Sequence, residues 1–338
     1  MKTDKKIQTM KQNKQILTKN DNFQCITKKD DAFRGSKPYP SAEWWYFDSI
    51  LDNDYSIHIG FRILSFQNLH ILKPSINIYH KSNLIAHETK LIPKKYFFTS
   101  KEKPLLQIEN ESVMFVNDAE NNEDKYWTYN VNYKLNNIGA FLKFKGITEG
   151  WKYETINEGW TVSLPQASVI GNIFLNNEIV AVNGMGYHDH NWNFSLKTPA
   201  RGWSWYWGKI RSEHFCLSWA NIKKTGILKQ TFLDRIGVLN TIKGSFDVID
   251  AENISISADT FIIKDSRKIP TKFHIYAKQD DLIIDVNLDT ISIHRTQPSA
   301  FTIHYWRYFV KISGKIKKGD TIDEIHDVTQ IMEFMRFI

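Results

Sequence analysis

Residues 126–145 alternate between apolar and polar side chains, and few folds can accommodate that pattern. The first half of the stretch places apolar side chains at every second position (Trp127, Tyr129, Val131, Tyr133 and Leu135). An Asn136-Asn137 pair follows, and the alternation resumes to Lys145. Successive side chains of an extended strand point to opposite faces, so the stretch predicts a β-hairpin with one apolar face and one polar face.

The same alternation recurs along the chain. Residues 55–64 show it, residues 167–190 form a second hairpin around Asn176-Asn177, and residues 282–293 follow an Asp280-Asp281 turn. No stretch of twelve residues has the apolar spacing of a helix. The fold class is therefore all-β. An up-and-down barrel takes about 140–180 residues, so a chain of 338 residues predicts two antiparallel β-barrels packed against each other.

The expected division of the chain is into three regions. Residues 1–40 form a basic leader, which Gly35, Pro38 and Pro40 close and which we expect to be disordered. Residues 41–200 form the first barrel and residues 201–338 the second. The pattern of strands breaks at Lys197-Thr198-Pro199-Ala200, and each half opens on a strand rich in tryptophan.

The charge of the chain is concentrated in its leader. Residues 1–40 hold ten Lys or Arg and four Asp or Glu, a net +6 of the total +7, and the remaining residues hold 34 against 33. A nearly neutral body argues against a nucleic-acid partner. The basic leader is either a solvated tail or an anchor on an acidic membrane surface.

Cellular location follows from what the sequence lacks. It has no apolar run long enough to span a membrane, and the leader has no signal-peptide core. Its two cysteines, Cys25 and Cys216, predict no disulfide framework. We therefore expect a cytoplasmic protein, with peripheral membrane association through the leader as the alternative.

Glycines, histidines and tryptophans gather most densely at residues 184–192 and 201–208. In an extended strand His188, His190 and Trp192 share one face, and Tyr187, Asp189 and Asn191 share the other. By the same rule Trp203, Trp205 and Trp207 line one side of the next strand. Two short strands can thus bring proton-transfer groups beside a wall of indole rings.

Asp189 with His188 or His190 is the candidate catalytic group. Burial in an aromatic cavity raises the pKa of a carboxyl, which can then donate a proton at neutral pH. Nearby indole faces would stabilise a carbocation. The alternative is that His188-Asp189-His190 is a hydrogen-bonded strut between the two halves.

A metal site and a nucleotide cofactor are both unexpected. Two histidines spaced as His188 and His190 can bind zinc or iron, but no third ligand follows at a fixed spacing. The sequence also has no P-loop, no Gly-x-Gly-x-x-Gly and no Gly-x-Ser-x-Gly.

Aromatic side chains are the candidate binding groups for a hydrophobic small molecule. Six of the eleven Trp fall in three short stretches, more than one layer of a core requires. The alternative is an aromatic core without a ligand. The candidate substrate-binding residues are Glu43, Trp45, Tyr187, Trp192, Trp203, Trp205, Tyr206 and Trp207.

Several of these motifs resemble the hydroxyneurosporene synthase (carotenoid hydratase) and AttH-like family. The matching stretches are Glu43-Trp44-Trp45-Tyr46-Phe47-Asp48, Gly184 to Trp192, Trp205-x-Trp207-Gly208 and Ile331-Met332-Glu333-Phe334-Met335. The resemblance covers residue 40 to the end and implies two tandem lipocalin-like barrels with a cavity near their junction. It also implies a site role for His190 and Trp192. A Tyr-x-Asp acid is expected after Trp207-Gly208, where this chain reads Phe215-Cys216-Leu217-Ser218-Trp219.

The resemblance implies a cofactor-independent enzyme acting on a hydrophobic, unsaturated isoprenoid, carotenoid or polyketide. In the leading hypothesis Asp189 or His190 protonates an alkene, Trp192, Trp205 and Trp207 shelter the cation, and water completes the addition. The first alternative is a pericyclic cyclase of the Diels–Alderase kind, in which the cavity holds a polyene in a reactive shape. The second alternative is a lipid or isoprenoid binding protein without chemistry.

Overall fold

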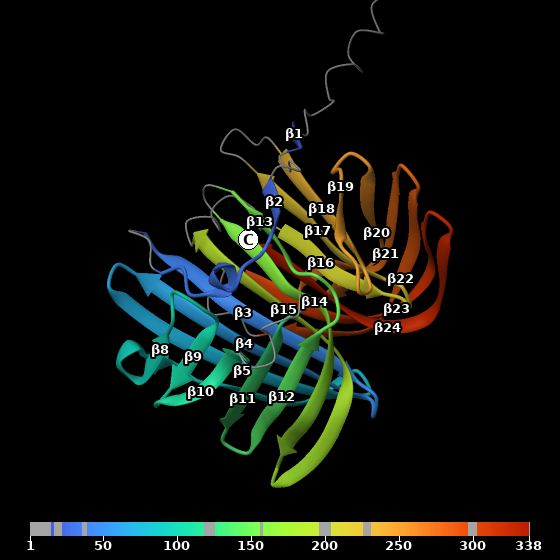
Figure 1. Cartoon of the computed structure of the whole chain (residues 1–338). Coiled ribbons are helices and arrows are strands. Elements are labelled where there is room, and N and C mark those ends of the chain that lie inside the picture. The colour runs from blue at the N-terminus through green and yellow to red at the C-terminus, as the bar shows by residue number, and fades with distance from the viewer. Residues whose placement is uncertain are drawn as a thin grey trace, which may run out of the picture.

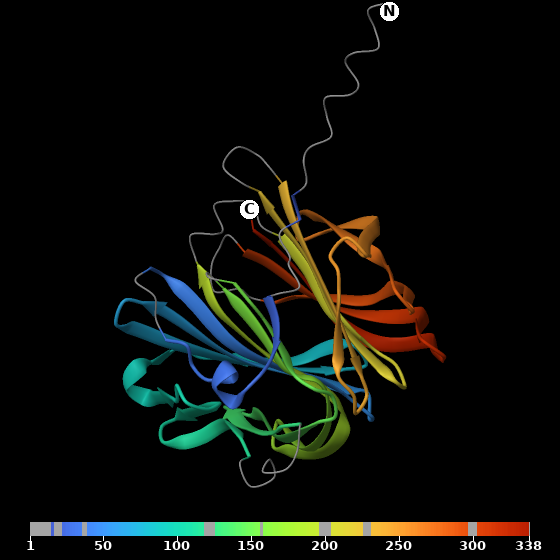
Figure 2. The same cartoon turned by 45° about the horizontal axis from the view of Figure 1, so that its top comes forward.

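Two curled antiparallel sheets make up the structure (Figures 1 and 2). The computed structural model describes residues 15–16, 22–35, 39–117, 126–155, 158–195, 204–225, 231–296 and 303–337. These residues contain no α-helix, only the 3-10 turns η2 (Lys28–Asp31) and η3 (Lys94–Tyr96). The all-β prediction is confirmed. Each sheet forms a half-barrel, since no strand pairing closes either sheet within the described residues.

The first half-barrel is a sheet of fourteen strands in the order β6-β5-β4-β3-β15-β14-β12-β11-β10-β9-β8, with β2, β7 and β13 attached at its sides. The first long strand pairs with the last, so the chain returns to its start and the sheet opens between β6 and β8. The strands are β2 (Phe23–Cys25), β3 (Ser41–Leu51), β4 (Tyr55–Phe66), β5 (Leu69–His80), β6 (Asn83–Thr89), β7 (Ile92–Pro93), β8 (Phe97–Thr99), β9 (Leu105–Ile108), β10 (Glu111–Val116), β11 (Thr128–Leu135), β12 (Ile138–Gly146), β13 (Trp151–Glu154), β14 (Gly159–Leu175) and β15 (Glu178–Ser195).

The second half-barrel repeats this plan with ten strands, in the order β1-β18-β17-β16-β24-β23-β22-β21-β20 with β19 beside β18. Its first long strand, β16, again pairs with its last, β24. The short β1 is the one parallel partner. The strands are β1 (Gln15–Ile16), β16 (Ser204–Arg211), β17 (Phe215–Thr225), β18 (Thr231–Thr241), β19 (Phe246–Ile249), β20 (Ile254–Lys264), β21 (Arg267–Gln279), β22 (Leu282–Thr296), β23 (Ile303–Lys318) and β24 (Thr321–Phe337).

Each half-barrel encloses a core of its own, because one face of every long strand is apolar. Val131 and Leu142 are buried inside the first, whereas Phe141 on the opposite face of β12 is 45% exposed. A third apolar cluster joins Tyr46, Tyr187 and Trp160 of the first sheet to Ala220 and Ile236 of the second. The outer faces of the two sheets therefore pack on each other through the strands at the centre of Figure 1.

Residues 22–35 belong to the first half-barrel, so the expectation of a disordered leader over residues 1–40 is wrong for this segment. The β2 strand pairs with β13, and Phe23 packs its ring against Trp151. Asp31 and Ala32 are buried. The basic composition of the leader concealed a short segment whose apolar and acidic side chains complete the fold. The expected division at residue 200 falls between β15 and β16, outside the described residues.

Candidate active site between the half-barrels

An aromatic pocket lies where the outer faces of the two sheets meet. It encloses about 900 Å³ including its open mouth. Its wall is mostly apolar, and three carboxyl groups also line it, Glu158, Asp189 and Glu333. The aromatic lining residues are Trp44, Tyr46, Tyr153, Trp160, Trp192, Trp205, Trp207 and Tyr305. A pocket of this size and polarity suits a hydrophobic small molecule.

Asp189 of β15 lines the pocket from the first sheet. Its Oδ2 accepts hydrogen bonds from Trp160 Nε1 at 2.9 Å and from the Tyr187 hydroxyl at 2.9 Å, and its Oδ1 accepts one from Asn191 Nδ2 at 3.1 Å. Burial outweighs these donors and raises the pKa of Asp189 to about 6. The carboxyl is thus rigidly held, and it gains or loses a proton near neutral pH.

Glu333 of β24 faces the same pocket from the second sheet. Its Oε2 accepts a hydrogen bond from Trp207 Nε1 at 2.9 Å and another from the Tyr305 hydroxyl. Its Oε1 accepts from Arg307 at 2.7 Å. Burial raises the pKa of Glu333 to about 8, and the nearby charge of Asp48 adds to the shift. Two buried acids with different pKa values therefore line one indole-walled space.

Tyr46 connects Glu333 to a second buried carboxylate. Its hydroxyl lies 2.9 Å from Glu333 Oε1 and 2.9 Å from Asp48 Oδ2, and it accepts a hydrogen bond from Arg307 at 2.6 Å. Because a phenol has one proton, Tyr46 can donate to only one of the two carboxyls. Each carboxyl has a buried cationic partner, since Lys209 Nζ lies 2.5 Å from Asp48 Oδ2 and Arg307 lies 2.7 Å from Glu333 Oε1. Burial raises the pKa of Asp48, but the charges of Lys209, Arg307 and Arg211 outweigh it and lower that pKa, whereas burial raises the pKa of Glu333 to about 8, so Glu333 binds a proton more readily.

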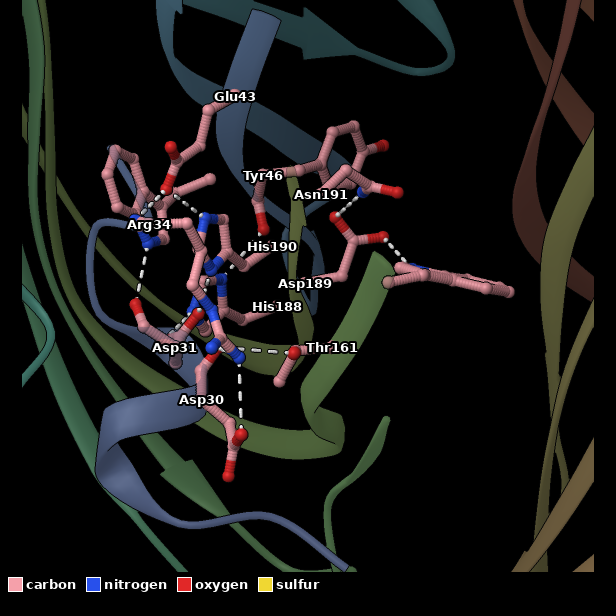
Figure 3. Close-up of polar contacts among 12 residues, drawn as sticks. Asp30, Asp31, Arg34, Glu43, Tyr46, Thr161, His188, Asp189, His190 and Asn191 are labelled. Carbon is pink, nitrogen blue, oxygen red and sulfur yellow. Dashed lines mark hydrogen bonds and ion pairs between the residues drawn. The ribbon is translucent and has the colours of Figure 1, made fainter. Parts of the chain in front are cut away.

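The two histidines of the central motif point away from the pocket. Figure 3 shows His188 and His190 on one side of β15, with Asp189 on the other. The structure therefore does not pair Asp189 with a histidine as a proton-transfer unit. Alternation along the strand already predicted that Asp189 lies on the face opposite to His188 and His190, and the structure has this arrangement.

A buried polar cluster holds both histidines. His188 Nε2 donates to Asp31 Oδ2 at 2.9 Å, and its Nδ1 donates to the Tyr46 carbonyl at 3.0 Å. His190 Nε2 donates to Glu43 Oε1 at 2.9 Å, and its Nδ1 lies 3.4 Å from Asp31 Oδ1. Burial alone lowers the pKa of His190, but the two carboxylates outweigh it and raise that pKa to about 9. The cluster is centred on Asp31, lies within the first half-barrel and does not include Asp189, so it differs from the strut between the two halves that the sequence offered as the alternative.

The other candidate residues divide between the pocket and its surroundings. Trp192, Trp205 and Trp207 line the pocket. Glu43 and Trp45 belong to the buried histidine cluster, where Trp45 stacks on His190 at 4.7 Å. Tyr187 stands behind Asp189 as a hydrogen-bond donor, and Tyr206 packs inside the second half-barrel on Phe334. Trp203 lies outside the described residues.

Sequence reasoning missed Glu333, the acid that the second sheet contributes. The signal was present, because Glu333 interrupts the apolar run Ile331-Met332-Glu333-Phe334-Met335. A carboxyl with apolar neighbours on both sides along a strand is expected to be buried, and a buried carboxyl is a candidate functional group. Its pairing with Trp207 across the β16–β24 ladder cannot be read from a separation of 126 residues.

No group of three or more His, Cys, Asp or Glu in the described part of the chain is arranged to hold a metal ion. No helix among the same residues is long and apolar enough to span a bilayer.

Comparison with solved structures identifies the fold. One match is a candidate AttH from Nitrosomonas europaea, with a TM-score of 0.65 and 12% identity over 93% of this chain and 98% of that one. The fold is lipocalin-like, in two halves. CghA with Sch210972 matches with a TM-score of 0.60 and 9% identity over 89% of this chain and 88% of that one. Kievitone hydratase from Nectria haematococca matches at 0.55 and 9% identity over 96% of each chain.

No family model and no curated protein matches by sequence. Identities this low describe the fold alone. Together with the resemblance in the sequence motifs, they confirm the expected architecture of two lipocalin-like halves.

Proposed function

We propose that this protein is a hydratase that adds water across a carbon–carbon double bond of a hydrophobic, unsaturated small molecule. The observation that carries the proposal is the pair of buried carboxyls, Asp189 and Glu333, in one indole-walled pocket. Their pKa values are about 6 and about 8. When the surroundings of two neighbouring carboxyl groups give them different pKa values, one commonly serves as the general acid and the other as the general base.

The pKa values assign the roles. Near neutral pH Glu333 is mostly protonated, so it donates its proton to one alkene carbon. Asp189 is mostly ionised, so it takes a proton from the water that adds to the other carbon. The faces of Trp205 and Trp207 stabilise the cation between these two steps. Each turnover leaves a proton on Asp189 and removes one from Glu333, and exchange with solvent restores both.

No step of this reaction requires a cofactor. Tyr46 and Trp207 hold the Glu333 carboxyl in place, and Trp160, Tyr187 and Asn191 hold that of Asp189. The fold shared with kievitone hydratase adds support for the reaction class.

Cyclisation of a polyene is the second candidate function, because the pocket wall is built largely from rigid indoles. The two functions differ in their sensitivity to mutation. Hydration depends on Asp189 and Glu333, whereas cyclisation depends on pocket shape and responds more strongly to Trp205→Ala.

The test begins with the material that copurifies with the protein, identified by mass spectrometry and then offered as a substrate in water enriched in oxygen-18. We expect a product that retains the heavy isotope. Asp189→Asn and Glu333→Gln should each lower turnover by about 10²–10⁴-fold, the usual contribution of a positioned acid or base. The profile of kcat/KM should rise through about pH 6 and fall through about pH 8. An unlabelled, isomeric product would favour cyclisation, and near-normal rates in both variants would exclude the proposed acid–base pair.

A further inference from the structure

A second hollow adjoins the indole-walled pocket on the outer face of the first sheet. It encloses about 680 Å³ including its open mouth. Trp44, Tyr46, Arg62 and Tyr305 line both spaces, so the two are neighbours with a shared wall. The hydratase mechanism uses only the first space, which leaves the second unexplained.

Strand register places the second hollow on the same face of the sheet as the catalytic carboxyl. Asp189 of β15 pairs with Tyr46 of β3, Tyr46 with Gly60 of β4, and Gly60 with Ser75 of β5. Residues paired across strands share one face. One continuous surface thus leads from Asp189 outward over β4 and β5.

Charge distinguishes the two spaces. Arg62 borders both spaces, and the second hollow is lined in addition by Lys73, His58 and His87 and by no Asp or Glu, whereas three carboxyls line the first. Within the part of the chain that the structure describes, Arg62 makes no hydrogen bond or ion pair. Its guanidinium lies 5.3 Å from the Trp44 ring centroid. A guanidinium offers five donors in a planar fork that fits a carboxylate or a phosphate.

A histidine pair adds a neutral donor to this cationic hollow. Asn77 links the two rings, with Nδ2 at 2.8 Å from His58 Nδ1 and Oδ1 at 2.6 Å from His87 Nδ1. When the amide donates to His58 Nδ1, the proton of His58 lies on Nε2. That nitrogen is 3.2 Å from where a Cβ of Gly60 would lie, so the missing side chain keeps the donor accessible.

We propose that the second hollow binds the anionic end of the ligand, a carboxylate or a phosphate monoester, while the apolar unsaturated part occupies the indole-walled pocket. The substrate class is then an unsaturated amphiphile with one anionic head. This inference rests on the proposed function only in taking the bound ligand to be the substrate. Neighbouring strands lie about 4.8 Å apart, so Arg62 and Lys73, two and three strands from Asp189, lie about 10–15 Å from the strand of Asp189 across the sheet.

The test compares four probes that share one chain and differ in the head group: palmitoleate, its methyl ester, the matching alcohol and the matching monophosphate. Quenching of tryptophan fluorescence reports binding, since Trp44, Trp205 and Trp207 line the pocket. We expect the full-length protein to bind the carboxylate or the phosphate at least about tenfold more tightly than both neutral probes, as a charged hydrogen bond requires. The two anionic probes distinguish a carboxylate ligand from a phosphate ligand.

Substitutions in the hollow test the residues. Arg62→Gln should remove most of the preference for the anion, measured as the ratio of the affinities for the anionic probe and for the alcohol, and Arg62→Lys should retain part of that ratio. The matched control is Lys272→Gln, since Lys272 is exposed in an ion pair on the second sheet and should leave all four affinities unchanged.

Two outcomes would overturn the inference: equal or weaker binding of both anionic probes relative to the neutral ones, or a preference that survives Arg62→Gln. The proposed function fails separately. Asp189→Asn and Glu333→Gln should keep the preference for the anionic probes, because neither residue lines the second hollow. Normal turnover in these two variants would overturn the hydratase mechanism but would not affect the proposed anion site.

Discussion

Asp31 holds the polar cluster together, and Asp31→Ala is expected to lower the free energy of unfolding by about 3–5 kcal/mol. The carboxylate is fully buried. It accepts hydrogen bonds from the Tyr129 hydroxyl at 2.5 Å and from His188 Nε2 at 2.9 Å, and it lies 3.4 Å from His190 Nδ1. In Asp31→Ala these three partners stay buried but lose the carboxylate that they contact. Removing one member of a buried ion pair typically costs about 3–5 kcal/mol of folding free energy, which is the expected loss.

Urea denaturation at pH 7, followed by tryptophan fluorescence, measures this loss. Asp289→Asn is the matched control, since Asp289 forms an exposed ion pair with Lys272 and its substitution should change stability by at most about 0.5 kcal/mol. A loss below about 1 kcal/mol in Asp31→Ala would contradict the reasoning, because it would mean that residues 22–35 do not complete the first half-barrel.

The same carboxyl gives the prediction a pH dependence. Burial alone would raise the pKa of Asp31, but the charges and hydrogen bonds of His188 and His190 hold that pKa well below its usual range. A lowered pKa stabilises the fold above the unfolded-state value and ceases to do so as the pH falls through the folded-state value. The difference between wild type and Asp31→Ala should therefore shrink as the pH falls below about 4, the ordinary value for an aspartate.

Three further predictions concern the surroundings of the pocket. Burial lowers the pKa of His190, but its two carboxylate partners outweigh burial and raise that pKa to about 9. The stabilisation that protonated His190 gives the fold is therefore complete below pH 6.5 and is lost as the pH rises through about 9. Urea midpoints between pH 6 and 10 should fall more for wild type than for His190→Gln, and parallel curves would contradict this. Gly159→Ala should weaken ligand binding at least tenfold in a fluorescence titration, because the new Cβ would lie 2.0 Å from the Trp192 ring; unchanged affinity would mean that Trp192 does not shape the pocket. Lys209→Met should lower the free energy of unfolding by about 3–5 kcal/mol in urea, since it removes the nearest cation of the buried Asp48 carboxylate and leaves Arg211, at 4.0 Å, as the remaining ion-pair partner. A neutral effect would show that Arg211 or protonation of Asp48 compensates for the loss without cost.

The strands could be read from the sequence because their signals are local. Alternation at residues 126–145 predicted the β11–β12 hairpin, and the structure pairs Thr128 with Lys145 through to Leu135 with Ile138. Asparagine tolerates the left-handed backbone that tight turns require, and Asn136 has a φ of 52°. Local chemistry thus determined both the strands and their connection.

The site was only half readable, because its parts come from distant strands. Alternation correctly separated Asp189 from His190 and put Trp205 and Trp207 on one side. It could not show which face meets the other half-barrel, and so it could not exclude His190 as the proton donor. Glu333 reaches the pocket only through the pairing of β16 with β24, and no local pattern encodes a contact between strands so far apart in the chain.

The leader shows the opposite failure, in which composition concealed structure. A net charge of +6 over residues 1–40 is typical of a solvated tail. Asp31 nevertheless lies within that stretch and is the carboxylate on which both buried histidines depend. Net charge averages over residues, whereas burial is decided one side chain at a time.

The account depends on two carboxyl groups that hold raised pKa values in one pocket. Carbon-13 NMR titration of the side-chain carboxyls, assigned through Asp189→Asn and Glu333→Gln, measures those values directly and needs no substrate. We expect midpoints of about 6 for Asp189 and about 8 for Glu333. Midpoints for both groups near or below the ordinary values of about 4 would mean that neither acid is sheltered from water, and the proposed acid–base pair would have to be abandoned.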